Sequence, residues 1–286
     1  MINRFVLGLF AILASCTHVA PPPPGGAKFT VGQPYQAGGE WQYPQDYNDY
    51  DTTGLATVLS NAGPYTADNE SYDPNALAAA SPVLQLPCIV TVTNLVNGLS
   101  MQVRVNDRGP MQPGRVLAVT PRVARMLGFP AGGIVEVEVK LDQADSMALQ
   151  SSLGAVPKLT AAPVAGITAQ SLGAPGGGAS GAVQQLSPSG GGGELNQGVT
   201  LSGAITQVSP APGPLWVQIP GFGSEDDAYR TMAKLPAMPT RVVPVTGGDR
   251  PLWAVNAGPY HTVADADAAL QQMLQAGITD PEIIVR

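Results

Sequence analysis

The segment CIVTVTNLVNGLSMQVRVND, residues 88–107, decides the fold of the first half of the chain. It contains two runs of alternating apolar and polar residues around Asn97-Gly98, a dipeptide that is typical of tight β-hairpin turns. A third alternating run, GGIVEVEVKL at 132–141, places its valines on one face and its charged residues on the other. Many short strands with few helices predict a small β-barrel.

Two short helices are expected between these strands. Thr120 can cap a helix that has Pro121 at its first position and Gly128 just past its end. The segment DPNALAAAS at 73–81 offers a second helix, whose first residue would be the N-cap. Cys88, in the first strand of the hairpin, is interpreted as a buried apolar side chain.

The N-terminus indicates export from the cytoplasm. Arg4 precedes the apolar run FVLGLFAILAS at 5–15, which is too short to span a bilayer but suits the core of a signal peptide at 1–15. The residues LASC, ending at Cys16, resemble a bacterial lipobox, which predicts cleavage before Cys16 and its lipidation. A plain signal peptide with an incidental cysteine is the alternative. Thr17 after the cysteine implies, by resemblance to bacterial sorting, retention on the periplasmic face of the outer membrane, where acyl chains would provide an anchor.

Composition divides the rest of the chain. Residues 16–33 include APPPPGG and are expected to form a Pro-rich tether. The segment 147–213 contains no aromatic residue and only two charged ones, so a disordered Gly/Pro/Ser/Ala-rich linker is predicted at 144–213. Folded domains are then expected at 34–143 and 214–286.

The second domain contains an internal repeat. VQIPGFGSEDDAYRTMAKL at 217–235 and VNAGPYHTVADADAALQQM at 255–273 each run from a strand to a Ser or Thr cap and an amphipathic helix. With two further strands, TRVVPVT and EIIVR, they predict a βαββαβ domain of ferredoxin-like or RNP-like shape. An RNA-binding domain is the competing interpretation, but five basic residues against eight acidic ones in 214–286 argue against nucleic acid as a partner.

Four segments of the first domain together resemble the double-psi β-barrel of the rare lipoprotein A (RlpA) family. They are TGLATVLS at 53–60, YTADNESYDPNALAAAS at 65–81, LPCIVTVTNLVNGLSMQVRVNDRGP at 86–110 and GRVLAVTPRVARMLGF at 114–129. The second domain resembles a SPOR domain. The resemblance implies a lytic transglycosylase that cleaves peptidoglycan strands stripped of their stem peptides, and a SPOR domain that binds such denuded strands at the division septum, where divisome proteins are possible partners.

The resemblance also implies a catalytic residue. Asp107 matches the family's essential aspartate, and Glu70 matches its second important carboxylate. A lytic transglycosylase uses the C6 hydroxyl of muramic acid as an internal nucleophile, so one carboxyl can protonate the leaving oxygen and later accept the C6 proton. This requires a raised pKa, from burial or from a nearby acid such as Glu70. The residues alone favour simpler roles, with Asp107 capping a strand end and Glu70 as a solvated loop acid.

Three residues are further candidates for substrate binding in the barrel, namely Ser81, Asn106 and Arg108. On a regular strand Arg108 would face away from Asp107, which equally fits a structural role. The aromatic-rich stretch EWQYPQDYNDYD at 40–51 either packs against the barrel or reaches the substrate.

The chain departs from the family at several positions. Ser81 stands where relatives usually carry a histidine, Ala118 where they carry an aspartate, and Val58 and Leu59 where they carry aromatic residues. A non-catalytic peptidoglycan-binding lipoprotein is therefore the main alternative, and a barrel that loosens plant cell walls is a distant third.

In the second domain, the sheet face opposite the helices is expected to hold sugar through stacking and side-chain amides. The candidates are Gln218, Phe222, Trp253, Asn256 and Tyr260. Core positions are the alternative for Phe222 and Tyr260. With only two histidines in the chain and no metal-ligand spacing, neither a metal site nor a cofactor is expected.

Overall fold

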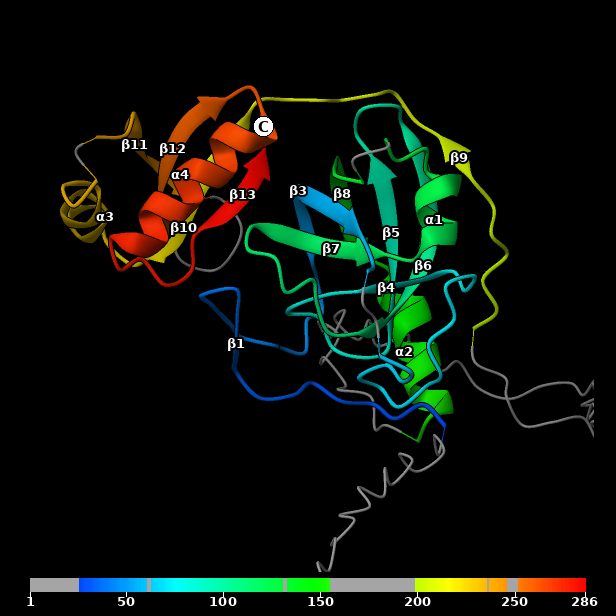
Figure 1. Ribbon diagram of the computed structural model, residues 1–286. Coiled ribbons are helices and arrows are strands. Elements are labelled where there is room, and N and C mark those ends of the chain that lie inside the picture. Colours follow the sequence, from blue (N-terminus) through cyan, green and yellow to red (C-terminus); the bar gives the residue numbers. More distant parts are fainter. Residues whose placement is uncertain (1–25, 61–62, 131–132, 155–198, 236, 246–251) are drawn as a thin grey trace, which may run out of the picture.

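A computed structural model describes residues 26–60, 63–130, 133–154, 199–235, 237–245 and 252–286 (Figure 1). The expected signal peptide, Cys16 and the central part of the expected linker lie outside these residues. Within them, no helix is long and apolar enough to cross a membrane.

The first domain is a closed barrel of six strands. These are β3 (Asp51–Val58), β4 (Ala78–Ala80), β5 (Cys88–Asn94), β6 (Leu99–Asp107), β7 (Arg115–Val119) and β8 (Val135–Leu141). They are ordered β4-β7-β3-β8-β5-β6, and β6 pairs back with β4 to close the barrel. The β3–β7 and β4–β6 pairs are parallel, and the others are antiparallel. The barrel expected from the sequence is confirmed.

The hairpin that decides this fold is β5–β6. Cys88 pairs with Val105, and the register continues without interruption to Thr93 and Ser100. The turn uses Gly98 at φ 76, a left-handed conformation that glycine adopts without a steric penalty. Cys88 is fully buried and its thiol is free, as expected.

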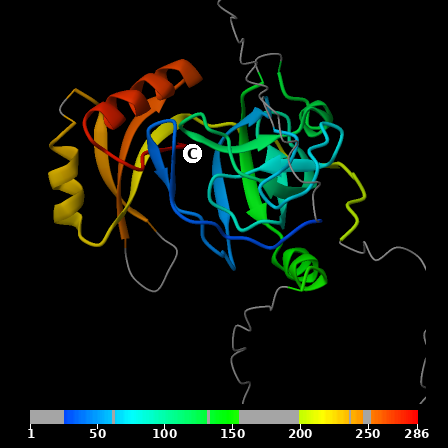
Figure 2. The same ribbon diagram turned by 60° about the horizontal axis from the view of Figure 1, so that its bottom comes forward.

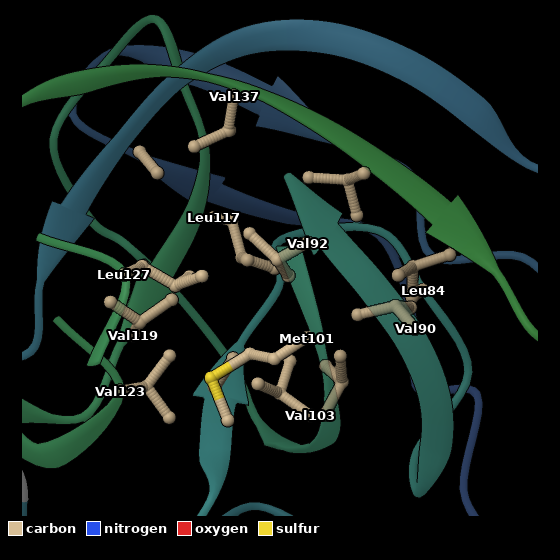
Figure 3. Packing of buried hydrophobic residues seen from close by; sticks show 14 of the residues in the cluster. Leu84, Val90, Val92, Met101, Val103, Leu117, Val119, Val123, Leu127 and Val137 are labelled. Atoms are coloured by element: carbon tan, nitrogen blue, oxygen red, sulfur yellow. The ribbon is translucent and has the colours of Figure 1, made fainter. Parts of the chain in front are cut away.

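Inward-facing side chains from every strand fill the barrel (Figure 3). The close-up shows Val90 and Val92 from β5 and Met101 and Val103 from β6 pointing into the same core. Full burial of each such side chain contributes about 1.5–3 kcal/mol. The alternation in sequence therefore determines which face of every strand points into the core.

One of the two expected helices forms. Helix α1 (Pro121–Met126) starts at Thr120, whose hydroxyl accepts a hydrogen bond from the Val123 amide. The segment 73–81 is not a helix: Asp73 makes a side-chain turn with the amide of Asn75, and the alanines that follow form β4. The helix propensity of these alanines is overridden because β4 pairs with both β6 and β7 and thereby closes the barrel.

Folded residues extend into both ends of the range expected to be linker. Helix α2 (Gln143–Ser152) packs against β5, where the Ser146 hydroxyl bonds both the amide and the carbonyl of Ile89. Strand β9 (Thr206–Gln207) pairs with the start of β6. At the other end of the domain, Thr30, from the expected tether, exchanges backbone hydrogen bonds with Leu86.

The second domain is a four-stranded antiparallel sheet with two helices. Its elements are β10 (Leu215–Phe222), α3 (Glu225–Met232), β11 (Thr240–Val245), β12 (Leu252–Tyr260), α4 (Val263–Gln275) and β13 (Glu282–Val285). The strand order β11-β12-β10-β13 is the expected ferredoxin-like arrangement. The helices are capped by Ser224 and Thr262, as the repeat predicts.

The two domains pack against each other. The Arg115 guanidinium of the barrel bonds both carboxylate oxygens of Asp267 on α4, at 2.7 and 2.8 Å. The Thr53 hydroxyl on β3 donates to the Val285 carbonyl of β13 at 2.7 Å and accepts from its amide at 3.2 Å. Leu55 belongs to the same apolar cluster as the core of the second domain. A short hairpin, β1 (Tyr35–Ala37) and β2 (Glu40–Gln42), lies beside this junction (Figure 2).

Candidate functional site

Asp107 stands where two surface hollows meet. It is the last residue of β6, and its carbonyl accepts a hydrogen bond from the Ser81 amide beside the end of β4. One hollow, of about 540 Å³, runs from Asp107 past Glu70 and Arg104. The other, of about 500 Å³, also includes Asp107 and runs past Ala118. A chain-like ligand lying in both hollows would therefore cross the Asp107 carboxyl.

Only one oxygen of the Asp107 carboxyl, Oδ1, accepts hydrogen bonds within the described part of the chain. Its Oδ1 accepts hydrogen bonds from the backbone amides of Ala67 at 2.9 Å and Arg108 at 2.8 Å. Its Oδ2 accepts none from the residues that the structure describes. Burial raises the pKa of Asp107, and these two amides and the Arg108 charge oppose the rise. A proton would reside on Oδ2, because Oδ1 already accepts two N–H groups.

Glu70 is fixed by both oxygens. Oε1 bonds the Arg104 guanidinium and Oε2 bonds the Asn106 amide, each at 2.8 Å. Both partners project from β6 on the same face, two residues apart. Glu70 is not among the groups that perturb the pKa of Asp107, so the expected acid neighbour does not explain that rise, whereas the expected burial does.

Asp68 is an acid of the site that the sequence analysis missed. It is fully buried, and its Oδ1 bonds the Thr66 hydroxyl at 2.6 Å and the Glu70 amide at 3.3 Å. Burial, reinforced by the Glu70 charge, raises the pKa of Asp68 to about 6, while Thr66 and Arg104 lower it. These bonds shape the loop that presents the Ala67 amide to the catalytic candidate.

The side chains of Arg108 and Ser81 form hydrogen bonds with backbone groups of the barrel domain. The Arg108 guanidinium donates to the carbonyls of Val31, Ser81 and Leu84. The Ser81 hydroxyl accepts from the amides of Val83 at 3.4 Å and Leu84 at 3.3 Å. Of the three candidates for substrate binding in the barrel, Asn106 lines the larger hollow, Arg108 lines the smaller one and Ser81 lines neither.

A second set of residues that the sequence analysis missed comes from within the range expected to be linker, 144–213. Val199, Leu201 and Ser202 line the larger hollow together with Glu70. They are brought there because the chain continues into β9, which pairs with β6. Nothing in the type or spacing of these residues predicted that they would lie there.

Comparison with known proteins agrees with this architecture. Residues 51–139 match the lytic transglycolase family, and residues 211–284 match the SPOR domain. The chain is 39% identical over 111 residues to the endolytic peptidoglycan transglycosylase RlpA of Yersinia pestis, covering 38% of this chain and 31% of that protein.

The chain belongs to the RlpA family. The RlpA of Pseudomonas aeruginosa is 38% identical over 123 residues, covering 42% of this chain and 36% of its own length. That of Rickettsia bellii is 32% identical over 123 residues, covering 41% of this chain and 54% of its own length. The match to these three relatives thus spans between about a third and about half of their length.

In this RlpA-family chain the five residues expected to bind sugar in the SPOR domain do not lie on one face of its sheet. Gln218 and Asn256 face each other on neighbouring strands, are buried, and are joined by a 2.7 Å hydrogen bond. Phe222, Trp253 and Tyr260 instead pack against the core beneath the helices. Trp253 is three residues from Asn256 and so points to the other face, and a register shift after Ile219 turns Phe222 the same way.

Proposed function

We propose that this protein is an endolytic lytic transglycosylase that cleaves peptidoglycan strands without stem peptides and leaves 1,6-anhydro ends. The observation that supports this most is the Asp107 carboxyl, placed where two hollows meet with one oxygen free for the substrate. The relatives named as endolytic peptidoglycan transglycosylases support the same activity.

The reaction needs only one carboxyl. Protonated Asp107 donates from Oδ2 to the glycosidic oxygen as the bond from that oxygen to C1 breaks. The resulting carboxylate then accepts the proton of the C6 hydroxyl as O6 bonds to C1. Asp107 is returned to its protonated state and no water is consumed. The burial that raises the pKa of Asp107 favours the protonated form with which the cycle begins.

Glu70 acts as a positioning residue in this proposal. It ties the loop 66–70 to β6 through Arg104 and Asn106, and the same loop presents the Ala67 amide to Asp107. Both Glu70 oxygens already accept hydrogen bonds, so a direct proton transfer from Glu70 would first have to break one of them.

The remainder of the chain would deliver the enzyme to its substrate. We propose that the SPOR domain binds denuded strands and concentrates the protein at the division septum. We also propose that a lipid on Cys16 anchors it on the periplasmic side of the outer membrane, in line with the lipobox-like sequence.

A non-catalytic glycan-binding protein is the second candidate. It is favoured by the contacts of Ser81, whose hydroxyl is occupied by backbone amides and supplies no imidazole to the site. It is also favoured by Ala118, which lines the smaller hollow with only a methyl group.

Cleavage of purified strands separates the two candidates. Soluble protein starting after Cys16 is incubated with amidase-stripped strands, beside Asp107→Asn and the control Asp226→Asn, which removes an exposed acid on α3 that lines neither hollow. We expect shortened strands from wild type and Asp226→Asn only. Intact strands with all three proteins, together with retained binding, would support the second candidate.

A further inference from the structure

A separate cleft lies at the junction of the two domains. It has a volume of about 310 Å³ and is lined by strand β2 and the residues that follow it, by the start of β7 and by the segment leading into β13. Among the described residues, none that lines it also lines either hollow at Asp107. Figures 1 and 2 both place the hairpin beside the junction, and the Trp41 amide bonds the Thr279 carbonyl of the second domain at 3.2 Å.

Two exposed aromatic side chains form one wall of this cleft. Trp41 is 43% exposed and Tyr43 is 47% exposed, although both rings are large and apolar. Their ring centroids lie 6.4 Å apart with an interplanar angle of 28°, so the two rings are stacked and each has an outer face that the other ring does not cover. Tyr47 and Tyr50 lie deeper, in an edge-to-face pair. Flat aromatic faces of this kind stack against apolar faces of ligands.

A carboxyl from each domain faces the same cleft. Glu40, from the hairpin, is only 5% exposed, and its Oε2 accepts hydrogen bonds from Gly114 and Gln42. Its Oε1 is buried and has no partner within the part of the chain that the structure describes. A buried polar atom without a partner is costly and points to a missing ligand or water. Glu282, from β13, supplies the second carboxyl.

The charges around these carboxyls favour a neutral ligand. The pKa of Glu40 is raised to about 7, mainly by burial and slightly by the Glu282 charge, while the hydrogen bond from Gly114 and the Arg115 charge oppose the rise. Burial likewise raises the pKa of Glu282 to about 7, with Asp280 raising it and Arg286 lowering it. Near neutral pH each group is therefore partly protonated and can both donate and accept hydrogen bonds, as the hydroxyl groups of a sugar require.

We propose that this cleft is a second carbohydrate site, in which Trp41 and Tyr43 stack against pyranose rings while Glu40 and Glu282 bond their hydroxyl groups. That the sugar belongs to a peptidoglycan strand rests on the proposed function. Because Glu40 comes from the barrel and Glu282 from the second domain, an occupied cleft would also hold the two domains together. The strand would then also be bound outside the two hollows at Asp107, where it is cleaved.

Binding to intact strands tests this site. The soluble chain after Cys16 carries Asp107→Asn throughout, so that no strand is cleaved, and its affinity for amidase-stripped strands is measured by isothermal titration. Replacing Trp41 and Tyr43 together by alanine should weaken binding at least about tenfold, which corresponds to about 1.4 kcal/mol. The matched control is Tyr229→Ala, which removes a 48% exposed aromatic ring from α3, away from the cleft.

Two further variants guard against a local folding defect. Trp41→Phe keeps an aromatic face and should retain most of the affinity, and Glu40→Gln should weaken binding without changing the far-ultraviolet circular dichroism spectrum. An affinity of the double alanine variant equal to that of Tyr229→Ala would overturn the proposal. Cleavage is measured separately with Asp107 intact. This distinguishes an active enzyme whose junction cleft does not bind strands from an inactive protein whose junction cleft does.

Discussion

The ion pair between Arg115 and Asp267 should hold the two domains together. The Arg115 side chain is fully buried, whereas that of Asp267 is 35% exposed, and Asp267→Ala would leave the guanidinium unpaired. Removing one partner of a fully buried pair costs about 3–5 kcal/mol. Since water can partly replace an exposed carboxylate, we expect a loss of about 2–3 kcal/mol.

Urea unfolding of the soluble chain measures this loss. Tryptophan fluorescence reports on the second domain, which contains Trp216 and Trp253, and on the junction, where Trp41 lies. The control is Asp226→Ala, which removes an exposed acid from α3 and should change the free energy of unfolding by less than about 0.5 kcal/mol. Equal midpoints for Asp267→Ala and this control would refute the reasoning and would mean that the domains do not dock through Arg115.

Three other predictions concern the junction and the site. Burial holds the folded-state pKa of Glu282 at about 7, above the ordinary 4.5, so the folded state binds more protons and stability falls as pH rises between these values. Glu282→Gln should flatten that slope in urea titrations. Gly54→Ala should destabilise the docked state, because its Cβ would lie 2.9 Å from the Ile283 carbonyl, and hydrogen exchange in β13 should rise. Glu70→Gln should lower the turnover rate, while the pH at which activity falls as Asp107 ionises should move little, since the Glu70 charge is not among the groups that perturb that pKa.

The parts of the fold that follow local rules could be predicted from the sequence. The turn at Asn97-Gly98, the cap at Thr120 and the repeat in the second domain each depend on neighbouring residues, and each is confirmed. The repeat is confirmed in an unexpected way, because the equivalent residues Gln218 and Asn256, 38 positions apart, bond each other across adjacent strands. Local patterns sufficed wherever the partners were close in sequence or related by the repeat.

Features that depend on long-range packing could not be predicted in this way. The alanines of 78–80 form a strand because both neighbouring strands of the barrel need a partner there. The pairing of Arg115 with Asp267 joins residues 152 positions apart, and neither residue carries a local signal. By contrast, the opposite facing of Trp253 and Asn256 followed from strand alternation and could have been predicted.

The candidate site likewise contains residues that the sequence could indicate and residues whose position depends on long-range packing. The family resemblance made Asp107 the catalytic candidate, and burial raises its pKa as expected. The burial of Asp68 within the loop 66–70 and the position of Leu201 at the larger hollow both depend on tertiary contacts, so the sequence offered no signal for either.

The origin of the oxygen at the newly formed sugar ends distinguishes transglycosylation by Asp107 from hydrolysis. Denuded strands are incubated with wild type and Asp107→Asn in water enriched in heavy oxygen, and the masses of the products are measured by mass spectrometry. We expect anhydro ends without heavy oxygen from wild type and intact strands from Asp107→Asn. Ends that carry heavy oxygen would show hydrolysis by water, and cleavage that persists in Asp107→Asn would show that another group supplies the proton; either result would refute the proposed role of Asp107.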